Sequence, residues 1–252
     1  MKVLLIGSGG REHSLVWKLH QSDLVSELTC LPGNAGISEI ANIVPIKAHE
    51  IENIIEHVRL KQYDFVIIGP EQPLAMGLVD KLKDIGVKVF GPTQAAAQLE
   101  SSKEFTKKLC SKYNIPTAKY GVFDNLKGAK SYIKKMRPPY VIKADGLAAG
   151  KGVVLPETLD EALNELEELF SGKFGNASSK VLIEEFMEGQ EASFFAISDG
   201  VNILPLIAAQ DHKRQRRVQG GAAPWPRDHQ GVGRVRRCRA AGEGAGAAAQ
   251  DL

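Results

Sequence analysis

The hydrophobic and polar positions of the first ninety residues follow two alternating periods. Short apolar runs, typical of buried strands, occur at 2–6, 27–31, 65–68 and 87–90. Between them, apolar residues recur at spacings of three and four, the period of an amphipathic helix. These helices are predicted over 11–20, 51–58 and 73–85. Strands and helices that take turns in this way build an α/β layer, so we expect an open parallel sheet.

A different pattern begins at about residue 100. The polar stretch through Ser101 and Ser102 precedes a helix whose Phe105, Leu109 and Tyr113 share one face. Further strands are predicted at 120–123, 140–143, 153–155, 181–185 and 193–197, and further helices over 125–136 and 159–170. The last strand can pair with 202–207 across Asp199-Gly200, a dipeptide that favours hairpin turns. This order indicates a mixed α+β unit.

The composition changes abruptly after Arg214. Gly, Ala and Arg supply 22 of the last 38 residues, from which Lys and Ile are absent. Residues 1–214 carry a formal charge of −2 and residues 215–252 carry +4, so the net charge of +2 averages two unlike pieces. We interpret 215–252 as a Gly/Ala/Arg-rich tail that is not native to the fold. Its arginines lack interleaved aromatic residues, so we expect no nucleic-acid partner.

Composition and cysteine spacing exclude several classes of protein. A chain of 252 residues that is 43% hydrophobic and 25% charged is typical of a globular protein and excludes a disordered coil. Cys30, Cys110 and Cys238 lie far apart, which argues against a disulfide framework or a zinc cluster. The apolar run 3–6 is too short for a signal peptide, and no stretch of about 18 apolar residues follows. We therefore expect a cytoplasmic protein that does not span a membrane.

A glycine-rich turn at residues 7–10 (GSGG) follows the first strand and precedes the first helix. Glycines there let the backbone approach a ligand, and free amides at a helix start favour an anion. Glu12 stands where the dinucleotide fingerprint requires glycine, which argues against a dinucleotide. A mononucleotide, a sugar phosphate and a plain tight turn remain open interpretations.

Two more turns, at 32–34 (PGN) and 69–71 (GPE), follow the second and third strands. Parallel strands place their carboxyl ends at one edge of the sheet, where open α/β sheets bind ligands. Glu71 there can accept hydrogen bonds from a sugar hydroxyl or an amine, although a Glu in such a turn is commonly only solvated. The three turns together favour one shared crevice.

The most informative segment is 141–153 (VIKADGLAAGKGV). Lys143 ends a strand, and a loop of small residues with three glycines and Lys151 follows. The amides of such a loop can fold over a polyphosphate while the ammonium groups offset its charge. Gly152 stands where the Walker pattern requires Ser or Thr, so magnesium must be held from elsewhere. The alternative is a flexible surface hairpin.

Two further segments carry candidate chemistry. Residues 183–193 (IEEFMEGQEAS) place acids at the end of one strand and the start of another. A hinge there can offer backbone groups to an adenine edge and a carboxylate to ribose hydroxyls, unless it is only an acidic hairpin. Residues 211–214 (DHKR) form a charged tetrad after the apolar stretch 203–209, and a solvated strand end is the simpler interpretation.

Taken together, these motifs resemble the glycinamide ribonucleotide synthetase (phosphoribosylamine-glycine ligase) family of the ATP-grasp superfamily. The resemblance covers residues 1–214 through GSGGREH, PGN, GPEQPL, FGP, SSKEFTK, VIKADGLAAGKGV, EEFMEGQEAS and QDHKR. It implies an ATP-dependent ligase of purine biosynthesis that joins glycine to 5-phosphoribosylamine through glycyl phosphate. The products would be glycinamide ribonucleotide, ADP and phosphate, and Mg²⁺ would accompany the ATP.

The resemblance also implies roles for individual residues. ATP would be bound by Lys103, Lys143, Gly146, Gly150, Lys151, Gly152, Glu184, Glu185, Phe186 and Glu191. In that set, Lys103 and Lys143 would contact the phosphates, and residues 146–152 would form a lid over them. Residues 184–186 would frame the adenine, and Glu191 would bind the ribose hydroxyls. The 5-phosphoribosylamine would lie against Gly9, Gly10, Asn34 and Glu71. The phosphate-transfer site would be bordered by Asp211 on the substrate side and by the catalytic residues Lys213 and Arg214.

The domain order of the family would divide the chain into an α/β substrate-binding domain (1–100), an ATP-grasp linker helix and α+β lid (101–192), an incomplete central ATP-grasp domain (193–214) and the tail. The family continues after DHKR with a GPNTGGMGAYSP-type segment, a Glu and an Asn that hold magnesium, and a C-terminal domain, none of which occurs here. We therefore expect a truncated, inactive chain without metal ligands, in which apolar strands such as 203–208 are exposed. The alternatives are a non-catalytic nucleotide-binding remnant and an ATP-grasp ligase with another amine acceptor.

Overall fold

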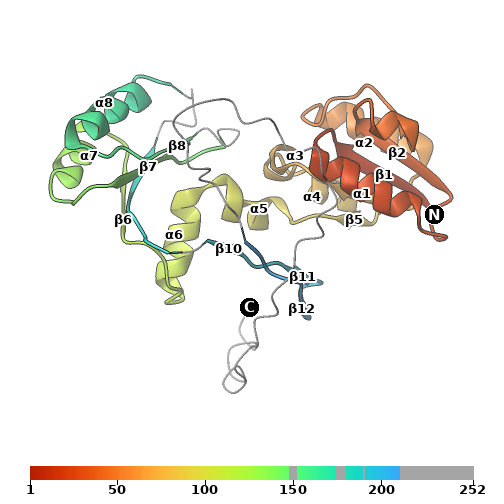
Figure 1. The fold of residues 1–252 in the computed structure, drawn as a ribbon. Coiled ribbons are helices and arrows are strands. Elements are labelled where there is room, and N and C mark those ends of the chain that lie inside the picture. The colour runs from red at the N-terminus through yellow and green to blue at the C-terminus, as the bar shows by residue number, and fades with distance from the viewer. Residues whose placement is uncertain (148–151, 174–179, 190, 211–252) are drawn as a thin grey trace, which may run out of the picture. The chain divides into compact units, whose positions relative to one another are not determined.

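The computed structural model describes residues 1–147, 152–173, 180–189 and 191–210 (Figure 1). The chain divides into two compact units, the first of which ends at Glu188 while the second begins at Gly189. The first unit contains a parallel sheet followed by an antiparallel sheet, and the second contains short antiparallel strands. Among the described residues, none of the helices combines the length and the apolar character that a membrane crossing requires.

A five-stranded sheet in the order β3-β2-β1-β4-β5 forms the first part of the chain (Figure 1). All of its pairings are parallel, so the predicted open parallel sheet is confirmed. Its strands are β1 (Lys2–Gly7), β2 (Glu27–Pro32), β3 (Asn42–Ile43), β4 (Phe65–Ile68) and β5 (Val89–Phe90). The central strand β1 is buried from its second residue onward, which explains its continuous apolar run.

Helices cover both faces of this sheet. The helices of this part of the chain are α1 (Gly10–His20), α2 (Ile51–Lys61), α3 (Glu71–Ala75), α4 (Leu78–Asp84) and α5 (Gln94–Ser101), with a 3₁₀ turn at Ile37–Glu39. Leu4 and Ile6 of β1 pack against α2 and α4, whereas Val3 and Leu5 pack with Val16 of α1 on the other face. Because side chains alternate between the two faces of a strand, the sheet has a separate apolar cluster on each face.

The single helix predicted over 73–85 is wrong, because the structure has two helices there. The break between α3 and α4 lies at Met76 and Gly77. Gly77 has a φ of +80°, a left-handed conformation that no regular helix contains and that glycine adopts at little cost. Helix α5, which the sequence analysis did not predict, begins after Thr93, whose hydroxyl accepts a hydrogen bond from the Ala96 amide at 3.3 Å.

A four-stranded antiparallel sheet in the order β6-β9-β7-β8 forms the lid part of the first unit. Its strands are β6 (Tyr120–Phe123), β7 (Tyr140–Ala144), β8 (Val153–Val154) and β9 (Val181–Glu185). The helices of this part are α6 (Lys103–Lys112), α7 (Leu126–Ile133) and α8 (Leu159–Phe170). The α+β composition expected for this part is thus confirmed.

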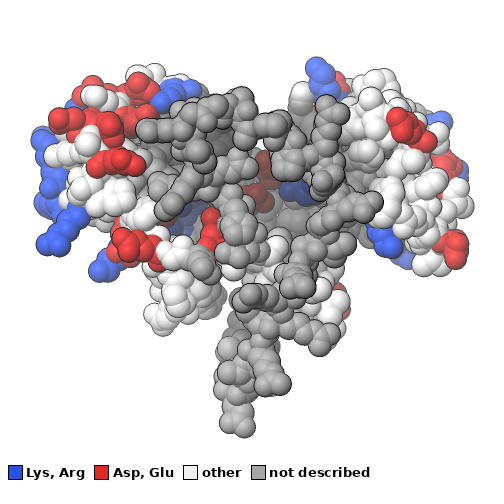
Figure 2. Space-filling model, in the orientation of Figure 1, with Lys and Arg blue, Asp and Glu red and all other residues white. Residues whose placement is uncertain are grey.

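Helices α7 and α8 cover one face of the lid sheet. The side chains of Ile142 and Ile183 pack against them in one apolar cluster. Figure 2 shows acidic side chains gathered over α8 and basic ones over α7, and Lys130 of α7 pairs with Glu167 of α8 at 2.5 Å. Because side chains alternate along a strand, the neighbouring residues of β7 and β9 point to the opposite face.

The second unit contains two small antiparallel pairs, β10 (Ala192–Ser193) with β13 (Ala209–Gln210) and β11 (Ala196–Ser198) with β12 (Ile203–Pro205). The single strand predicted over 193–197 is wrong, since β10 and β11 have different partners. The hairpin predicted across Asp199-Gly200 is confirmed. Asp199 Oδ1 accepts hydrogen bonds from the amides of Val201 at 2.9 Å and Asn202 at 2.7 Å.

Candidate functional site

The side chain of Glu12 lies at the carboxyl edge of the parallel sheet and is 4% exposed. Its Oε2 accepts a hydrogen bond from the Gly9 amide at 2.8 Å, and its Oε1 accepts one from Arg11 Nε at 2.9 Å. Burial raises the pKa of Glu12, but the hydrogen bonds from Arg11 and Gly9 outweigh burial and lower it below its ordinary value. The Gly9 amide, expected to be free for an anion, is therefore occupied by Glu12.

Three glycines leave the space that Glu12 fills. A Cβ atom on Gly69 would lie 2.5 Å from Glu12 Oε1, and one on Gly9 would lie 2.8 Å from Glu12 Oε2. A Cβ on Gly7 would overlap the Glu12 side chain as well. A Cβ on Gly10, by contrast, would meet no atom within 4 Å. The structure thus explains Gly7, Gly9 and Gly69 by the packing of one buried carboxylate.

The three predicted turns meet at this edge. Asn34 Nδ2 donates to the Ser8 carbonyl at 2.8 Å, which joins the second turn to the first. Arg11 Nη2 lies 3.7 Å from Glu71 Oε2, which joins the first turn to the third. The hydrogen bond to Glu12 and the charges of Glu12 and Glu71 raise the pKa of Arg11. An exposed guanidinium therefore lies between two carboxylates next to the glycine turn.

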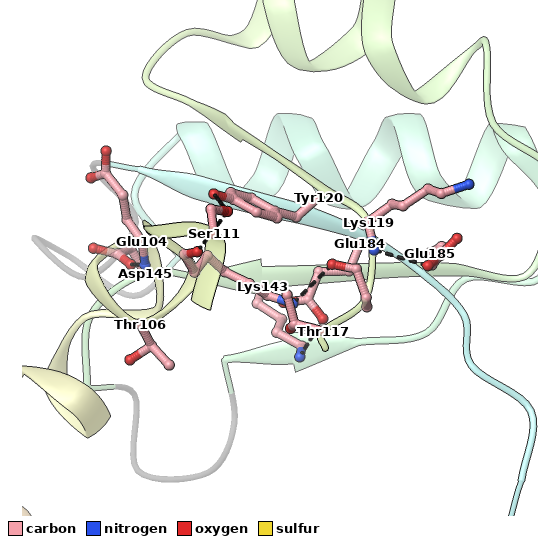
Figure 3. A network of polar contacts seen from close by, with 12 residues as sticks. Glu104, Thr106, Ser111, Thr117, Lys119, Tyr120, Lys143, Asp145, Glu184 and Glu185 are labelled. Carbon is pink, nitrogen blue, oxygen red and sulfur yellow. Dashed lines mark hydrogen bonds and ion pairs between the residues drawn. The ribbon is translucent and has the colours of Figure 1, made fainter. Parts of the chain in front are cut away.

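On the lid sheet, Lys143 and Glu184 lie on the face opposite α7 and α8, where Figure 3 shows them pointing toward one another. Lys143 Nζ is 2.8 Å from Glu184 Oε2. The other oxygen of Glu184 is 3.3 Å from Nζ of Lys107, which comes from α6. The side chains of Glu184 and Lys107 are 6% and 10% exposed, but that of Lys143 is 26% exposed. Of this trio of Lys107, Glu184 and Lys143, Lys143 is therefore the side chain most accessible to solvent.

A second lysine lies at the start of the glycine loop. Lys103 Nζ donates to the carbonyls of Asp145 at 3.2 Å and Gly146 at 3.3 Å. The Asp145 carboxylate accepts from the Glu104 amide at 2.7 Å and from Ser102 Oγ at 3.2 Å, so it adds to the cap of α6, in which Ser102 Oγ accepts from the Phe105 amide at 3.1 Å. Burial lowers the pKa of Lys103; the charge of Asp145 opposes this, and the charge of Lys143 adds to it.

The structure separates Glu184 from its neighbour Glu185. Figure 3 shows Glu185 directed toward Lys119, whose amide donates to Glu185 Oε1 at 2.9 Å. Glu185 and Phe186 line a cavity of about 370 Å³ together with Tyr132 of α7. A strand alternates its side chains between faces, so consecutive residues cannot both point toward Lys143. The carboxylates of Glu184 and Glu185 therefore do not frame one ligand from the same face.

The other predicted site residues divide between described and undescribed parts of the chain. The Gly152 carbonyl accepts from the Ala144 amide at 2.8 Å, which places the end of the glycine loop beside β7. Glu191 lies in the second unit. The remaining predicted residues fall outside the described residues: Gly150, Lys151, Asp211, Lys213 and Arg214.

Sequence reasoning missed three residues that organise these sites. Lys107 could have been suspected because it lies one helical turn after Lys103. Asp145 stands two residues after Lys143 in the glycine segment, and Glu12 was noted only for departing from the dinucleotide fingerprint. All three make their decisive contacts inside the folded chain, with partners that the spacing along the sequence does not identify.

Similar proteins agree with this architecture. The N domain of phosphoribosylglycinamide synthetase matches residues 1–100, and the ATP-grasp (A) domain of phosphoribosylglycinamide synthetase matches residues 101–223. A phosphoribosylamine–glycine ligase from Brucella melitensis biotype 1 is 54% identical over 214 residues, which are 85% of this chain and 50% of that protein. The corresponding ligase from Rhizobium meliloti (strain 1021) is 52% identical over 85% of this chain and 51% of its own length.

Solved structures show the same fold. Phosphoribosylamine–glycine ligase from Thermotoga maritima matches with a TM-score of 0.71 and 32% identity over 85% of this chain and 51% of that chain. The biotin carboxylase domain of Hydrogenobacter thermophilus 2-oxoglutarate carboxylase, in complex with MgADP, matches with a TM-score of 0.68 over 83% of this chain and 50% of that one. At 16% identity, that likeness concerns the fold alone.

The two domain matches are consecutive and together reach from residue 1 to residue 223. The chain spans about half of the length of the curated relatives that it matches. Its parallel sheet lies within the first match, and its antiparallel lid sheet lies within the second. The chain therefore belongs to the phosphoribosylglycinamide synthetase family.

Proposed function

We propose that this chain binds ATP on the lid face that carries Lys143 and binds 5-phosphoribosylamine at the carboxyl edge of the parallel sheet. It would do so within a cytoplasmic ligase of purine biosynthesis that joins glycine to 5-phosphoribosylamine, with ADP, phosphate and glycinamide ribonucleotide as products. One observation supports this above all: Lys103 donates to the carbonyls at the start of the glycine loop, and Lys143 lies near the end of β7, which leads into that loop, on the sheet face opposite the lid helices.

Phosphoryl transfer suits such an arrangement, because it requires positioning and charge neutralisation rather than a side-chain nucleophile. Lys103 now donates to two loop carbonyls, and its ammonium can turn from them to a phosphate oxygen. Lys143 has an open side and one carboxylate partner, so it can bind a phosphate without leaving Glu184. Both would stabilise the charge that develops as the γ-phosphoryl group moves to glycine.

The edge of the parallel sheet suits a sugar phosphate that carries an amine. The Arg11 guanidinium has donors in the geometry that phosphate oxygens accept, and the hydrogen bond from its Nε to Glu12 orients it. The Glu71 carboxylate can accept a hydrogen bond from the amine or from a ribose hydroxyl. We assign Asn34, Gly9 and Gly10 to the wall of this crevice, because Asn34 holds the glycine turn through Ser8.

Magnesium accompanies ATP in phosphoryl transfer, where it neutralises the phosphates. Within the parts of the chain that the structure describes, no group of three His, Cys, Asp or Glu side chains could hold a metal ion. The described residues are therefore expected to bind the phosphates and the sugar phosphate, and not the metal ion.

Calorimetric titration of the chain with ATP tests the nucleotide site. We expect the wild type to bind ATP, and we expect Lys103→Met and Lys143→Met each to weaken binding by about tenfold or more, the value of a charged hydrogen bond. Lys173→Met is the matched control, because Lys173 pairs with Glu165 and Glu168 on α8. A wild type that does not bind ATP, or lysine variants that bind like it, would overturn the assignment.

An assay of ADP release tests the reaction. Because the sequence predicts an inactive chain, we expect no ADP release with ATP, glycine and 5-phosphoribosylamine; release that requires both substrates would overturn that expectation and would show the ligase reaction directly. Release with a different amine would support another acceptor. ATP binding without any release fits both the inactive half of a ligase and a non-catalytic nucleotide-binding protein, and the response to 5-phosphoribosylamine separates these two. Protection of the chain from thermal unfolding by 5-phosphoribosylamine, lost in Glu71→Gln, would support the crevice.

A further inference from the structure

Lys107 is a buried lysine with a complete set of partners. It lies on α6, is 8% exposed, and donates from Nζ to Thr117 Oγ1 at 2.7 Å and to the Ala118 carbonyl at 3.2 Å. The same ammonium lies 3.3 Å from Glu184 Oε1 and 5.4 Å from the centre of the Tyr120 ring. A lysine is seldom buried unless its charge is paired, so the pairing with Glu184 is the feature to explain.

The two oxygens of Glu184 are divided between two lysines. Oε1 faces Lys107 inside the protein, and Oε2 faces Lys143 at the open side. Two ammonium groups and one carboxylate leave this trio with one net positive charge. Without Lys107, both oxygens of Glu184 would be available to Lys143, and the pair would be neutral. The position of the exposed ammonium and the net charge of the three side chains therefore depend on the enclosed lysine.

We propose that Lys107 is a positioning residue for the phosphates of the bound nucleotide. It holds one oxygen of Glu184, so that the other oxygen places the Lys143 ammonium at the open side, and it keeps the trio positively charged. Lys107 is enclosed by Thr117, Ala118 and Tyr120, and it acts through Glu184 rather than by touching the ligand. The inference deepens the proposed ATP site and rests on it.

A purely structural role makes a different prediction. If Lys107 only joined α6 to the lid sheet, its loss would lower the free energy of unfolding and would weaken adenosine and ATP binding to the same extent. Positioning of Lys143 concerns the phosphates alone, because adenosine carries none. The ratio of the two dissociation constants therefore separates the two roles.

The experiment compares Lys107→Met, Lys107→Arg and the matched control Lys108→Met in the full chain. Lys108 is the next residue on α6, but its side chain is 69% exposed and pairs with Glu104. Calorimetry measures the dissociation constants of ATP and of adenosine for each variant. We expect Lys107→Met to weaken ATP binding by about tenfold, as expected for one charge near a protein surface, and to leave adenosine binding unchanged. Lys107→Arg should restore most of the loss, and Lys108→Met should show none.

Thr117→Val gives a second test that does not depend on the folding of Lys107→Met. It removes the hydroxyl 2.7 Å from Lys107 Nζ with little change of shape. We expect ATP binding to weaken by about threefold, which is less than the full value of the charge-assisted hydrogen bond that is removed, because Lys107 keeps the Ala118 carbonyl and Glu184 as partners, and we expect adenosine binding to be unchanged. Equal loss for both ligands, or ATP binding as in the wild type, would overturn the positioning role.

These outcomes also separate the two proposals. If the wild type binds no ATP, the nucleotide site itself fails, and the role of Lys107 fails with it. If Lys143→Met weakens ATP binding while folded Lys107→Met and Thr117→Val do not, only the positioning role fails.

Discussion

Glu12 occupies the space that a side chain on Gly69 would need, because a Cβ built there would lie 2.5 Å from Glu12 Oε1. Glu12 lies in the first turn of α1, the helix that follows β1, and Gly69 directly follows β4. Their contact ties the ends of two neighbouring parallel strands together. Glycine at position 69 is thus a consequence of a buried carboxylate 57 positions earlier in the chain.

The first prediction concerns this contact. Gly69→Ala should lower the free energy of unfolding by about 2 kcal/mol, since overpacking a filled site displaces its neighbours. Chemical denaturation of the purified chain measures the loss. Gly10→Ala is the control and should cause no loss, because a Cβ at Gly10 meets no atom within 4 Å. If Gly69→Ala lowers the free energy of unfolding as much in a Glu12→Ala background as in the wild type, contact with Glu12 is not the cause of the destabilisation.

The second prediction is the pH dependence of stability. The folded state lowers the pKa of Glu12 below its ordinary value of 4.5, because the hydrogen bonds from Arg11 and Gly9 outweigh the effect of burial. The stability that ionised Glu12 contributes is therefore complete above about pH 4.5 and is lost as the pH falls through the lower folded pKa. Unfolding midpoints of the wild type and Glu12→Gln should differ at pH 6 and should converge on acidification. A constant difference across this range would contradict the role of the Glu12 charge.

The third prediction concerns the cap of α6. Asp145→Ala removes the acceptor of the Glu104 amide and of the Ser102 hydroxyl, and should destabilise the chain by about 1 kcal/mol, the value of a helix cap. Asp145→Asn keeps a carbonyl oxygen and should recover part of the loss. Asp160→Ala, an exposed acid in the first turn of α8, should change the unfolding midpoint much less. Equal losses at the two positions would show that Asp145 is not a specific cap.

Apolar patterns were sufficient to predict much of the fold. The strands β4, β6 and β9 begin and end at the residues predicted for them. In β4 the run of four apolar residues coincides with the strand, as is typical of a strand in a buried parallel sheet. The break at Gly77 was missed because one glycine in a helical pattern is compatible with either a continuous or a broken helix. The edge strand β3 has two residues, too few for any period to show.

The candidate site was predictable only in part, because some of its contacts join residues that are far apart in the sequence. Lys143 stands next to the glycine loop in the sequence, so the motif itself identifies it. Lys107 lies outside that motif, and its spacing from Lys103 does not identify its partners, because Glu184 comes from β9 and the Tyr120 ring comes from β6. The different roles of Glu184 and Glu185 depend on which face of the sheet each side chain takes, and a pair of adjacent acids does not indicate that face.

The last prediction concerns the hairpin of the second unit. Apolar side chains of this hairpin and of its flanks face solvent: Phe194 is 71% exposed, Ile203 67% and Ile207 75%. The expected exposure of residues 203–208 is thus observed at these positions. Apolar side chains that gather on one surface associate with other copies of the chain, whereas an isolated one does not.

Ile203→Thr combined with Ile207→Lys should therefore reduce concentration-dependent light scattering of the chain. The change should leave ATP binding intact, because the proposed ATP lysines lie in the first unit. Leu60→Lys is the matched control: Leu60 is 74% exposed, but it lies on α2 between Arg59 and Lys61 and belongs to no apolar cluster there. If Leu60→Lys reduces scattering as much as the hairpin variant does, net charge rather than the apolar hairpin governs association. If neither variant changes it, the exposed hairpin does not drive self-association.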